Sequence, residues 1–433
     1  MKTKKKTTHK KTRHKNTIHK NTTHKKTKYQ YTKKNSTYNS KNKLKTLRII
    51  TIDSEFNDYK NDMNAYSDIF KKCGYKIDIY IIQTDIRLNI KYSTNPYYDI
   101  NLFIDRIAPE NFKIKNIFPS RINIFSPNIN TFQNYKELRD IDIVLCNNKQ
   151  CYNFINFIKK ENKENNYTFK SYYTNFTTPI PNQLSTIRRS SKTMTHTNTM
   201  TNTKPMIFIH SVENQIHKNT GPLIHCWLTY NSHLNCELHI LCNSLCMTNL
   251  LLDIKKLYYY DLLNKYTFEK EHYPEQNKNQ ENYSSTVILK YKNLYIYLEL
   301  KQNDIKYKEL IKNADVALCP SRKDNYPHYI NTARYFNIFV ITMNNSPMNE
   351  LITNQSSNSG YLLKKSKLNT KVYKETNYRF DEIYPNIEEL RDSIVWCLEH
   401  QTDIKNYSKN NSGRKMFLDD KKYFENSIEK IIK

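Results

Sequence analysis

Short apolar runs alternate with helical or polar stretches along most of this chain, and this alternation constrains the fold more than any other feature. In the first part of the chain the apolar runs lie at residues 47–52, 77–82, 100–107, 122–125 and 143–146. A helical pattern at residues 63–73 ends at Gly74, and a second one covers residues 151–158. Because apolar strands separated by helices are typical of a parallel sheet, the pattern predicts a parallel α/β domain over residues 48–181.

The same alternation restarts after residues 182–204, which are rich in Ser, Thr and Asn and predict a flexible linker. The expected strands lie at residues 206–210, 237–242, 286–289, 294–298, 315–319 and 338–342. The expected helices begin at Thr220 and Asn386 and cover residues 247–263, 304–312, 327–336 and 347–353, with a polar loop at 269–284. The sequence thus predicts a second α/β domain over residues 205–408, an amphipathic C-terminal helix within residues 409–433, and a ligand site in the cleft between the domains.

Glycine and cysteine usage narrows the class of protein. The 433 residues include only four glycines, and the absence of both common glycine-rich phosphate-binding motifs excludes such loops. Nine cysteines, without the spacing of a disulfide scaffold, favour a reducing compartment. No apolar stretch has the length of a transmembrane helix and no signal-peptide pattern follows the basic start, so we expect a soluble cytoplasmic protein. Abundant Asn, Lys, Ile and Tyr indicate an AT-rich genome, such as that of a large DNA virus or a protist.

Residues 1–47 form a basic, low-complexity tail. The tail holds 17 of the 69 lysines and arginines of a chain with a formal net charge of +28, and it contains no acidic residue. A His-Lys-x-Thr unit recurs every five residues from His9 to Thr27, a period that fits neither a helix nor a strand, so we expect disorder. Such a tail can bind nucleic acid or an anionic membrane weakly and without sequence preference, or it can be a solvated segment without a partner.

Residues 313–333 carry the most specific motif, with the sequence NADVALCPSRKDNYPHYINTA. A strand that ends in Pro-Ser is followed by a loop and a helix, and Pro-Met-Asn-Glu-Leu at 347–351 and Gly360 follow. The segment resembles the donor-binding region of retaining family 4 glycosyltransferases of the GT-B type, in which two glutamates lie eight positions apart. Asp324 and Thr332 occupy those two positions here. The likeness is specific over residues 313–352 and weaker over the remainder of 48–433.

The resemblance implies an α/β fold of the GT-B type, with two Rossmann-like domains, and transfer of a sugar from a nucleotide-sugar donor. The acceptor is a glycan, lipid or protein, and no metal or other cofactor is expected. Asp324 would contact sugar hydroxyls, and Lys218, in the matching His-Lys-Asn-Thr segment, would neutralise the leaving diphosphate; these two are the candidate catalytic residues. The candidate donor-binding residues are Ser321, Arg322, Asn325, Tyr326, His328, Thr332, Asn349 and Glu350.

Physical chemistry supports such roles. A helix that begins near Pro327 would direct unpaired backbone N–H groups towards an anion, and Lys218 would face Asp324 across the gap between the domains. Residues 48–181 contain no histidine, so a base from the first domain would be a carboxylate. Asp53, Glu55 and Asp58 are the acceptor-side candidates, although acids in a surface loop are often only solvated. A retaining transfer can instead let the departing phosphate take the acceptor proton.

Several substitutions leave two functions open. Thr332 replaces the second glutamate, Asn325 and Pro327 replace glycines, and Asn214 stands where a second basic residue is common. Each change removes a charge or backbone freedom. The chain is therefore either a glycosyltransferase or a catalytically inactive GT-B scaffold or structural protein with a polyanion-binding tail.

Other clusters have a structural interpretation beside a functional one. Cys236, His239, Cys242 and Cys246 could hold zinc together with His233, but they lack paired Cys-x2-Cys spacing, and residues 237–242 fit a core strand better. Tyr258–Tyr260 fit packing better than base stacking. His328 could contact the donor or cap the helix surface.

Overall fold

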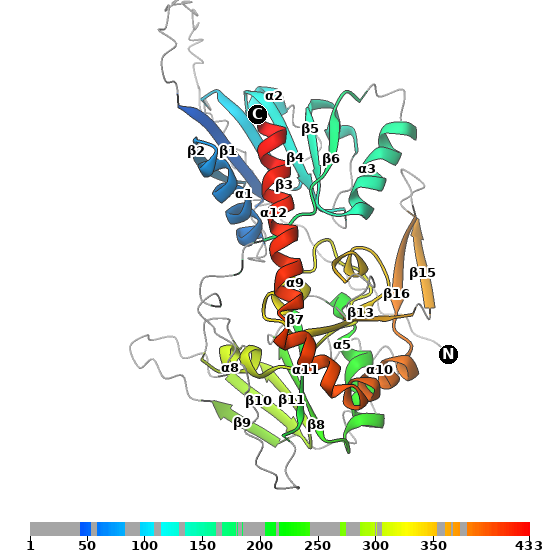
Figure 1. Cartoon of the computed structure of the whole chain (residues 1–433). Helices are drawn as coiled ribbons and strands as arrows, with labels where there is room; N and C mark the ends of the chain where they lie inside the picture. Colours follow the sequence, from blue (N-terminus) through cyan, green and yellow to red (C-terminus); the bar gives the residue numbers. More distant parts are fainter. Residues whose placement is uncertain are drawn as a thin grey trace, which may run out of the picture. The chain divides into compact units, whose positions relative to one another are not determined.

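The computed structural model describes residues 44–52, 59–82, 96–107, 114–129, 135–161, 167–178, 180, 184, 204–213, 216–242, 269–273, 286–298, 300, 305–352, 360–364, 367–372 and 379–433. Residues 44–433 form one compact unit (Figure 1). Several predictions fall outside the described residues: the tail up to residue 43, the acceptor-side candidates Asp53, Glu55 and Asp58, Asn214, Cys246 and the helix at 247–263.

The N-terminal half is built on a six-stranded sheet with the order β2-β1-β3-β4-β5-β6. The strands are β1 (Lys45–Ile52), β2 (Tyr75–Ile82), β3 (Tyr98–Asp105), β4 (Ser120–Pro127), β5 (Ile143–Cys146) and β6 (Lys170–Tyr173). Every neighbouring pair is parallel, which confirms the predicted sheet. The first strand begins at Lys45, three residues before the predicted domain start, and β6 was not predicted.

Helices pack against this sheet, and the buried residues of the first helix recur at helical spacing. They are α1 (Tyr59–Lys72), α2 (Ile114–Ile117), the 3-10 helix η1 (Tyr135–Asp140) and α3 (Lys149–Glu161). The buried face of α1 includes Tyr66, Ile69 and Phe70, which lie three and four residues apart. Gly74 follows the helix with a φ of 82°, a left-handed conformation that glycine adopts without steric cost, and the chain turns directly into β2.

The C-terminal half contains an eight-stranded sheet with the order β14-β13-β12-β7-β8-β11-β10-β9. The strands are β7 (Met206–Glu213), β8 (Cys236–Cys242), β9 (Glu269–Tyr273), β10 (Thr286–Tyr291), β11 (Leu294–Leu298), β12 (Val316–Cys319), β13 (Phe339–Met343) and β14 (Gly360–Leu363). Strands from β14 to β11 run parallel, but β10 and β9 are antiparallel additions. The predicted polar loop at 269–284 is therefore wrong at its start, because a charged edge strand lacks the apolar pattern of a buried strand.

The other elements of this half surround the sheet. They are η3 (Ile216–Lys218), α5 (Thr220–Cys226), the π-helical turn η4 (Trp227–Asn231), α8 (Ile305–Asn313), α9 (His328–Tyr335), η5 (Met348–Leu351), the hairpin β15 (Lys367–Val372) and β16 (Arg379–Tyr384), α10 (Ile387–Glu399) and α11 (Gln401–Lys409). The helix predicted at 347–353 is only the short 3-10 helix η5. Asn386 caps α10 as predicted, since its side-chain oxygen accepts a hydrogen bond from the Glu388 N–H at 2.8 Å.

The last helix, α12 (Ser412–Ile432), packs on both halves. Its Phe424 lies edge-on to Tyr66 of α1, with ring centroids 5.5 Å apart, and Ile428 is buried in the same core. Nearer its start, Phe417 lies edge-on to Tyr335 of α9 with centroids 5.5 Å apart (the red helix in Figure 1). One continuous helix thus completes the packing of both halves.

Gly413 allows the start of α12 to lie close to α9 and α11. A Cβ atom at this position would lie 2.7 Å from the Arg334 carbonyl oxygen and would also collide with the Tyr407 hydroxyl. We expect Gly413→Ala to lower the free energy of unfolding by about 1 to 3 kcal/mol, the usual effect of overpacking, in urea denaturation. Asn426→Ala, at an exposed position of the same helix, should change it by less than about 0.5 kcal/mol. Equal effects of the two substitutions would contradict this close packing.

The cysteine cluster in β8 belongs to the core. Cys236 and Cys242 are buried, which confirms the core-strand interpretation. His239 bonds instead to the Tyr297 hydroxyl at 3.0 Å and to the Glu237 carboxylate at 3.0 Å.

Among the described residues, no helix is both long and apolar enough to span a bilayer.

Candidate functional site

Lys218 and Asp324 meet at the carboxyl ends of two neighbouring strands. Lys218 ends η3, after β7, and Asp324 lies in the loop after β12, which pairs with β7. The Lys218 Nζ atom lies 2.7 Å from the Asp324 carboxylate, and the two side chains are only 5% and 7% exposed. The predicted proximity is present, but both residues belong to the C-terminal half, so the expected arrangement across the gap between the domains is wrong.

Two hydrogen bonds tie these two loops together, and a third joins the strands that precede them. The Arg322 N–H donates to the His217 carbonyl oxygen at 2.9 Å, and the Asn219 amide donates to the Pro320 carbonyl oxygen at 2.6 Å. Beneath them, His210 of β7 donates from Nδ1 to the Leu318 carbonyl oxygen at 2.7 Å. A carbonyl oxygen only accepts, so Nδ1 carries a proton, and in a neutral ring Nε2 is then the unprotonated nitrogen.

His210 is therefore a neutral connector. Its Nε2 accepts from the Thr220 hydroxyl at 2.9 Å, which holds the start of α5 against β12. Burial lowers the pKa of His210 to about 4, so the ring is uncharged near neutral pH. The position of Lys218 relative to Asp324 is thus set by buried groups that do not change charge in the physiological range.

Positive charge is concentrated around this pair. We call His217, Lys218, Arg322 and Lys323 the cationic cluster; burial first, and then the three cationic neighbours, lower the pKa of His217 to about 4. The Arg322 guanidinium donates to the Tyr384 hydroxyl of β16 at 2.8 Å and stacks over that ring at 5.3 Å. The hairpin that supplies Tyr384 was not predicted, because it is short, polar and antiparallel.

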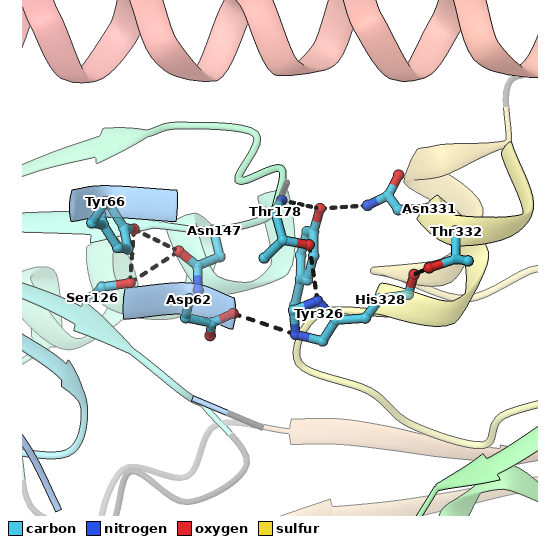
Figure 2. A network of polar contacts seen from close by, with 9 residues as sticks. All are labelled: Asp62, Tyr66, Ser126, Asn147, Thr178, Tyr326, His328, Asn331 and Thr332. Carbon is cyan, nitrogen blue, oxygen red and sulfur yellow. Dashed lines mark hydrogen bonds and ion pairs between the residues drawn. The ribbon is translucent and has the colours of Figure 1, made fainter. Parts of the chain in front are cut away.

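Asn325 and Tyr326 contact the N-terminal half. The Asn325 carbonyl oxygen accepts from the Asn148 amide at 2.6 Å, and its side-chain oxygen accepts from the Ile129 N–H at 3.3 Å. Tyr326 is buried with its ring edge-on to Phe176, at a centroid distance of 4.7 Å. Its hydroxyl accepts from the Thr178 N–H at 3.3 Å and from the Asn331 amide (Figure 2). These two predicted donor-binding residues therefore join the halves of the molecule.

His328 bridges the same halves through both ring nitrogens. Its Nδ1 lies 3.1 Å from the Thr178 hydroxyl, and its Nε2 lies 3.4 Å from the Asp62 carboxylate at the start of α1 (Figure 2). Beside it, Tyr66, Ser126 and Asn147 bond to one another within the N-terminal half. With Nδ1 hydrogen-bonded and Nε2 beside a carboxylate, the imidazole acts as a connector between the two halves.

Three of the N–H groups at the start of α9 are already paired within the protein. The His328 N–H donates to the Tyr326 carbonyl oxygen at 2.9 Å, and the N–H groups of Ile330 and Asn331 donate to the Pro327 carbonyl oxygen at 3.0 and 3.3 Å. The Thr332 hydroxyl likewise donates back into the helix, to the His328 carbonyl oxygen at 3.1 Å. These three N–H groups are therefore not open to phosphate in the way the sequence predicted.

The remaining predicted donor-binding residues have different surroundings. Ser321 is buried in the turn that follows β12, shortly before Asp324 in the sequence. Glu350 accepts from the Lys149 N–H at 2.9 Å, at the start of α3, and also bonds to the Ser346 hydroxyl. Asn349 bonds to the neighbouring Asn344 at 3.0 Å. Glu350 therefore stabilises the N-terminus of a helix in the other half.

The N-terminal half supplies partners that no motif indicated. Asp62, Asn148 and Thr178 contact the predicted donor loop, but single Asp, Asn and Thr residues in polar stretches give no sequence signal of their own. A cavity of about 290 Å³ lies elsewhere, between α1 and α12, lined by Ala65, Asp68, Ile69, Lys71, Lys72, Thr177, Lys421, Phe424 and Glu425. It contains none of the predicted site residues.

Solved structures share this architecture. A glycosyltransferase from Rickettsia africae ESF-5 matches with a TM-score of 0.53 and 12% identity, over 89% of this chain and 97% of that chain. Sucrose-phosphate synthase from Thermosynechococcus elongatus matches at 0.51 and 8% identity, over 86% and 94%. The Anabaena protein HepE, in complex with UDP and glucose, matches at 0.50 and 10% identity, over 88% and 99%. No protein-family model matches the chain, and no curated protein is similar to it.

At these identities the likeness concerns the fold. The structure has two sheets with parallel cores, one after the other along the chain, and a last helix that packs on both halves. This matches the architecture predicted from the motif at 313–352. The narrower resemblance to family 4 stays a prediction. The chain has the fold of the GT-B glycosyltransferases.

Proposed function

We propose that the chain transfers a sugar from a nucleotide-sugar donor to an acceptor hydroxyl. The observation that carries the proposal is the buried Lys218–Asp324 pair, at 2.7 Å, at the carboxyl ends of β7 and β12. Ligands of open α/β sheets bind at this edge. A cation and a carboxylate held there match the two parts of a sugar diphosphate, which are an anionic leaving group and a ring that carries hydroxyls.

In the proposed reaction, the bond from the sugar C1 to the diphosphate oxygen breaks and a bond from C1 to the acceptor oxygen forms. The Lys218 ammonium stabilises the charge that develops on the diphosphate, and Asp324 accepts hydrogen bonds from sugar hydroxyls. The acceptor proton passes to the departing phosphate, a route that the family resemblance supports together with retention of configuration. HepE, solved with UDP and glucose, supports a uridine diphosphate sugar as the first donor to examine.

Because the pair would act at the reacting centre, substitution should lower transfer by more than any loss of folded protein explains, although removing one partner of a buried pair also lowers stability. We expect Lys218→Ala and Asp324→Asn each to lower transfer from labelled UDP-glucose, or from another active donor in a nucleotide-sugar panel, by about 100-fold. Lys405→Ala, at an exposed position of α11, is the matched control and should transfer at the wild-type rate. Thermal unfolding of each variant separates lost chemistry from lost fold, and wild-type rates in both site variants would refute the proposal.

A second candidate is a GT-B scaffold without catalysis. The observation that favours it is that Asn325, Tyr326, His328 and Glu350 hold the N-terminal half, so these predicted donor-binding side chains are engaged in contacts within the protein. If this candidate is right, no nucleotide sugar should change the temperature of thermal unfolding, and no transfer should be measured. The chain should also bind nucleic acid in a salt-sensitive way, and this binding should disappear when residues 1–43 are deleted. Donor-dependent transfer by the full chain would exclude it.

A further inference from the structure

Two buried nitrogen atoms of the cationic cluster lack hydrogen-bond partners. Within the part of the chain that the structure describes, neither His217 Nδ1 nor Arg322 Nε has an acceptor or donor within reach. Buried polar atoms in proteins are nearly always paired, and leaving one unpaired costs about 1 to 3 kcal/mol. The described residues contain thirteen such atoms, and these two stand out because they lie on neighbouring loops beside the Lys218–Asp324 pair, where nitrogen donors could bind an anion.

The backbones of His217 and Arg322 are joined, and the Arg322 side chain is held in place, independently of any ligand. The His217 carbonyl oxygen accepts from the Arg322 N–H at 2.9 Å, which joins the two loops at this point. The Arg322 guanidinium is fixed from the other side by the Tyr384 hydroxyl at 2.8 Å. A site with fixed donors requires little rearrangement when an anion arrives.

The charges around His217 favour an anion. In the described chain, the charged groups that act on it are Lys323, Arg322, Lys218 and Asp324, which are three cations and one carboxylate. The carboxylate is already engaged by Lys218 at 2.7 Å. The field at His217 is therefore positive overall, and it opposes a further positive charge on the ring.

We propose that His217 and Arg322, together with Lys218, bind a diphosphate group, and that His217 takes up a proton from solvent as the diphosphate binds. The inference rests on the proposed function only in assigning this group to a nucleotide-sugar donor. The site recognises the diphosphate itself, through nitrogen donors on two loops. His217 thereby becomes a second N–H donor to the anion beside the guanidinium.

The sign of the coupling follows from the charges. The pKa of His217 is about 4 in the unoccupied protein, so the ring is neutral at pH 7. A bound anion offsets the field of Lys323, Arg322 and Lys218 and raises that pKa, so binding draws in a proton and strengthens as the pH falls from 7 towards 5. His210 also faces Lys218, but both of its nitrogens are engaged by Leu318 and Thr220, so it remains a neutral connector.

Titration calorimetry of the full chain tests this coupling, with inorganic pyrophosphate and UDP-glucose as probes at pH 5.5 and 7.5. Measurement in two buffers of different ionisation enthalpy gives the number of protons taken up. We expect the wild-type protein to take up a fraction of a proton per pyrophosphate at pH 5.5 beyond that taken up by His217→Gln. We also expect UDP-glucose to bind up to about tenfold more tightly at pH 5.5 than at 7.5.

The comparison between variants isolates His217, because protonation of the probe is common to all of them. His217→Gln, and His217→Asn as a second replacement, should abolish the extra proton and flatten the pH dependence. His225→Gln, on α5, is the matched control and should behave as the wild type. Equal proton uptake in wild type and His217→Gln would overturn the inference, as would failure of both probes to bind.

The two proposals can fail separately. Proton-coupled binding of pyrophosphate without transfer from any nucleotide sugar would support the anion site and count against the enzyme. Transfer that depends on Lys218, with binding that is independent of pH and of His217, would support the enzyme and overturn the coupling.

Discussion

Replacing Asp420 with alanine should lower the free energy of unfolding by about 2 to 4 kcal/mol, because it leaves the buried Arg334 charge without its partner, although Asp420 itself is 26% exposed. Asp420 of α12 accepts from Arg334 Nη2 of α9 at 2.5 Å, and its other oxygen accepts from the Asn175 amide at 2.8 Å. The Arg334 side chain is only 2% exposed. Without Asp420, a guanidinium would stay charged in the interior with Asn331 as a neutral neighbour at 2.7 Å.

Urea denaturation of three variants tests this account. Glu425→Ala, on the same helix, removes the ion pair with Lys72 at 3.3 Å, whose side chains are 58% and 27% exposed, and should cost less than about 1 kcal/mol. The double substitution Arg334→Met with Asp420→Leu removes both charges, and should recover much of the stability lost in Asp420→Ala. A loss below about 1 kcal/mol in Asp420→Ala would show that Arg334 does not depend on this partner.

Acidification from pH 6.5 to 4 should remove about 3 kcal/mol of stability through His210 alone. The pKa of His210 is lowered from 6.5 to about 4 because burial disfavours the charged ring. The unfolded chain therefore binds a proton below about pH 6.5, whereas the folded protein does so only near pH 4. The contribution of His210 is fully present above this window and is lost as the pH falls through it.

Two variants separate the protonation from the hydrogen bonds. His210→Gln lacks the titrating ring, so its stability should be lower at pH 7 but should decline less between pH 6.5 and 4. Thr220→Val removes only the hydroxyl that donates to Nε2 at 2.9 Å, so it should lower stability at every pH and keep the acid slope. Urea denaturation across this pH range provides the measurement. An unchanged slope in His210→Gln would assign the acid sensitivity to other groups.

The parallel strands were the most predictable part of the fold. The bounds of β5 and β11 agree with the prediction, β12 starts one residue late, and β13 is displaced by one residue at both ends. Their residues are buried on both faces, so continuous apolar runs mark them. By contrast, β9 and β16 carry charged residues at alternate or adjacent positions, and β15 contains two lysines and two further polar residues. Edge strands and hairpins of this kind are stabilised by pairing with a neighbour, which local sequence does not show.

The candidate site was predictable only where a motif carried it. The motif at 313–352 placed Asp324 near Lys218, and the structure brings the two within 2.7 Å. It gave no indication that Asn325, Tyr326 and His328 hold the N-terminal half, because their partners lie about 150 to 270 residues away in polar segments. It also gave no indication of His217 or Tyr384, whose importance depends on which loops meet in space.

The two ends of the described chain share one core, and this has a consequence for biosynthesis. Phe424 and Ile428 of α12 pack with Leu47 of β1 and Tyr66 of α1. During translation, the N-terminal half emerges first but lacks these side chains until α12 has been synthesised. The apolar residues that α12 covers would stay exposed on the nascent polypeptide, and contacts so distant in sequence form slowly. Expression of this protein should therefore depend on chaperones that shield these residues until α12 arrives.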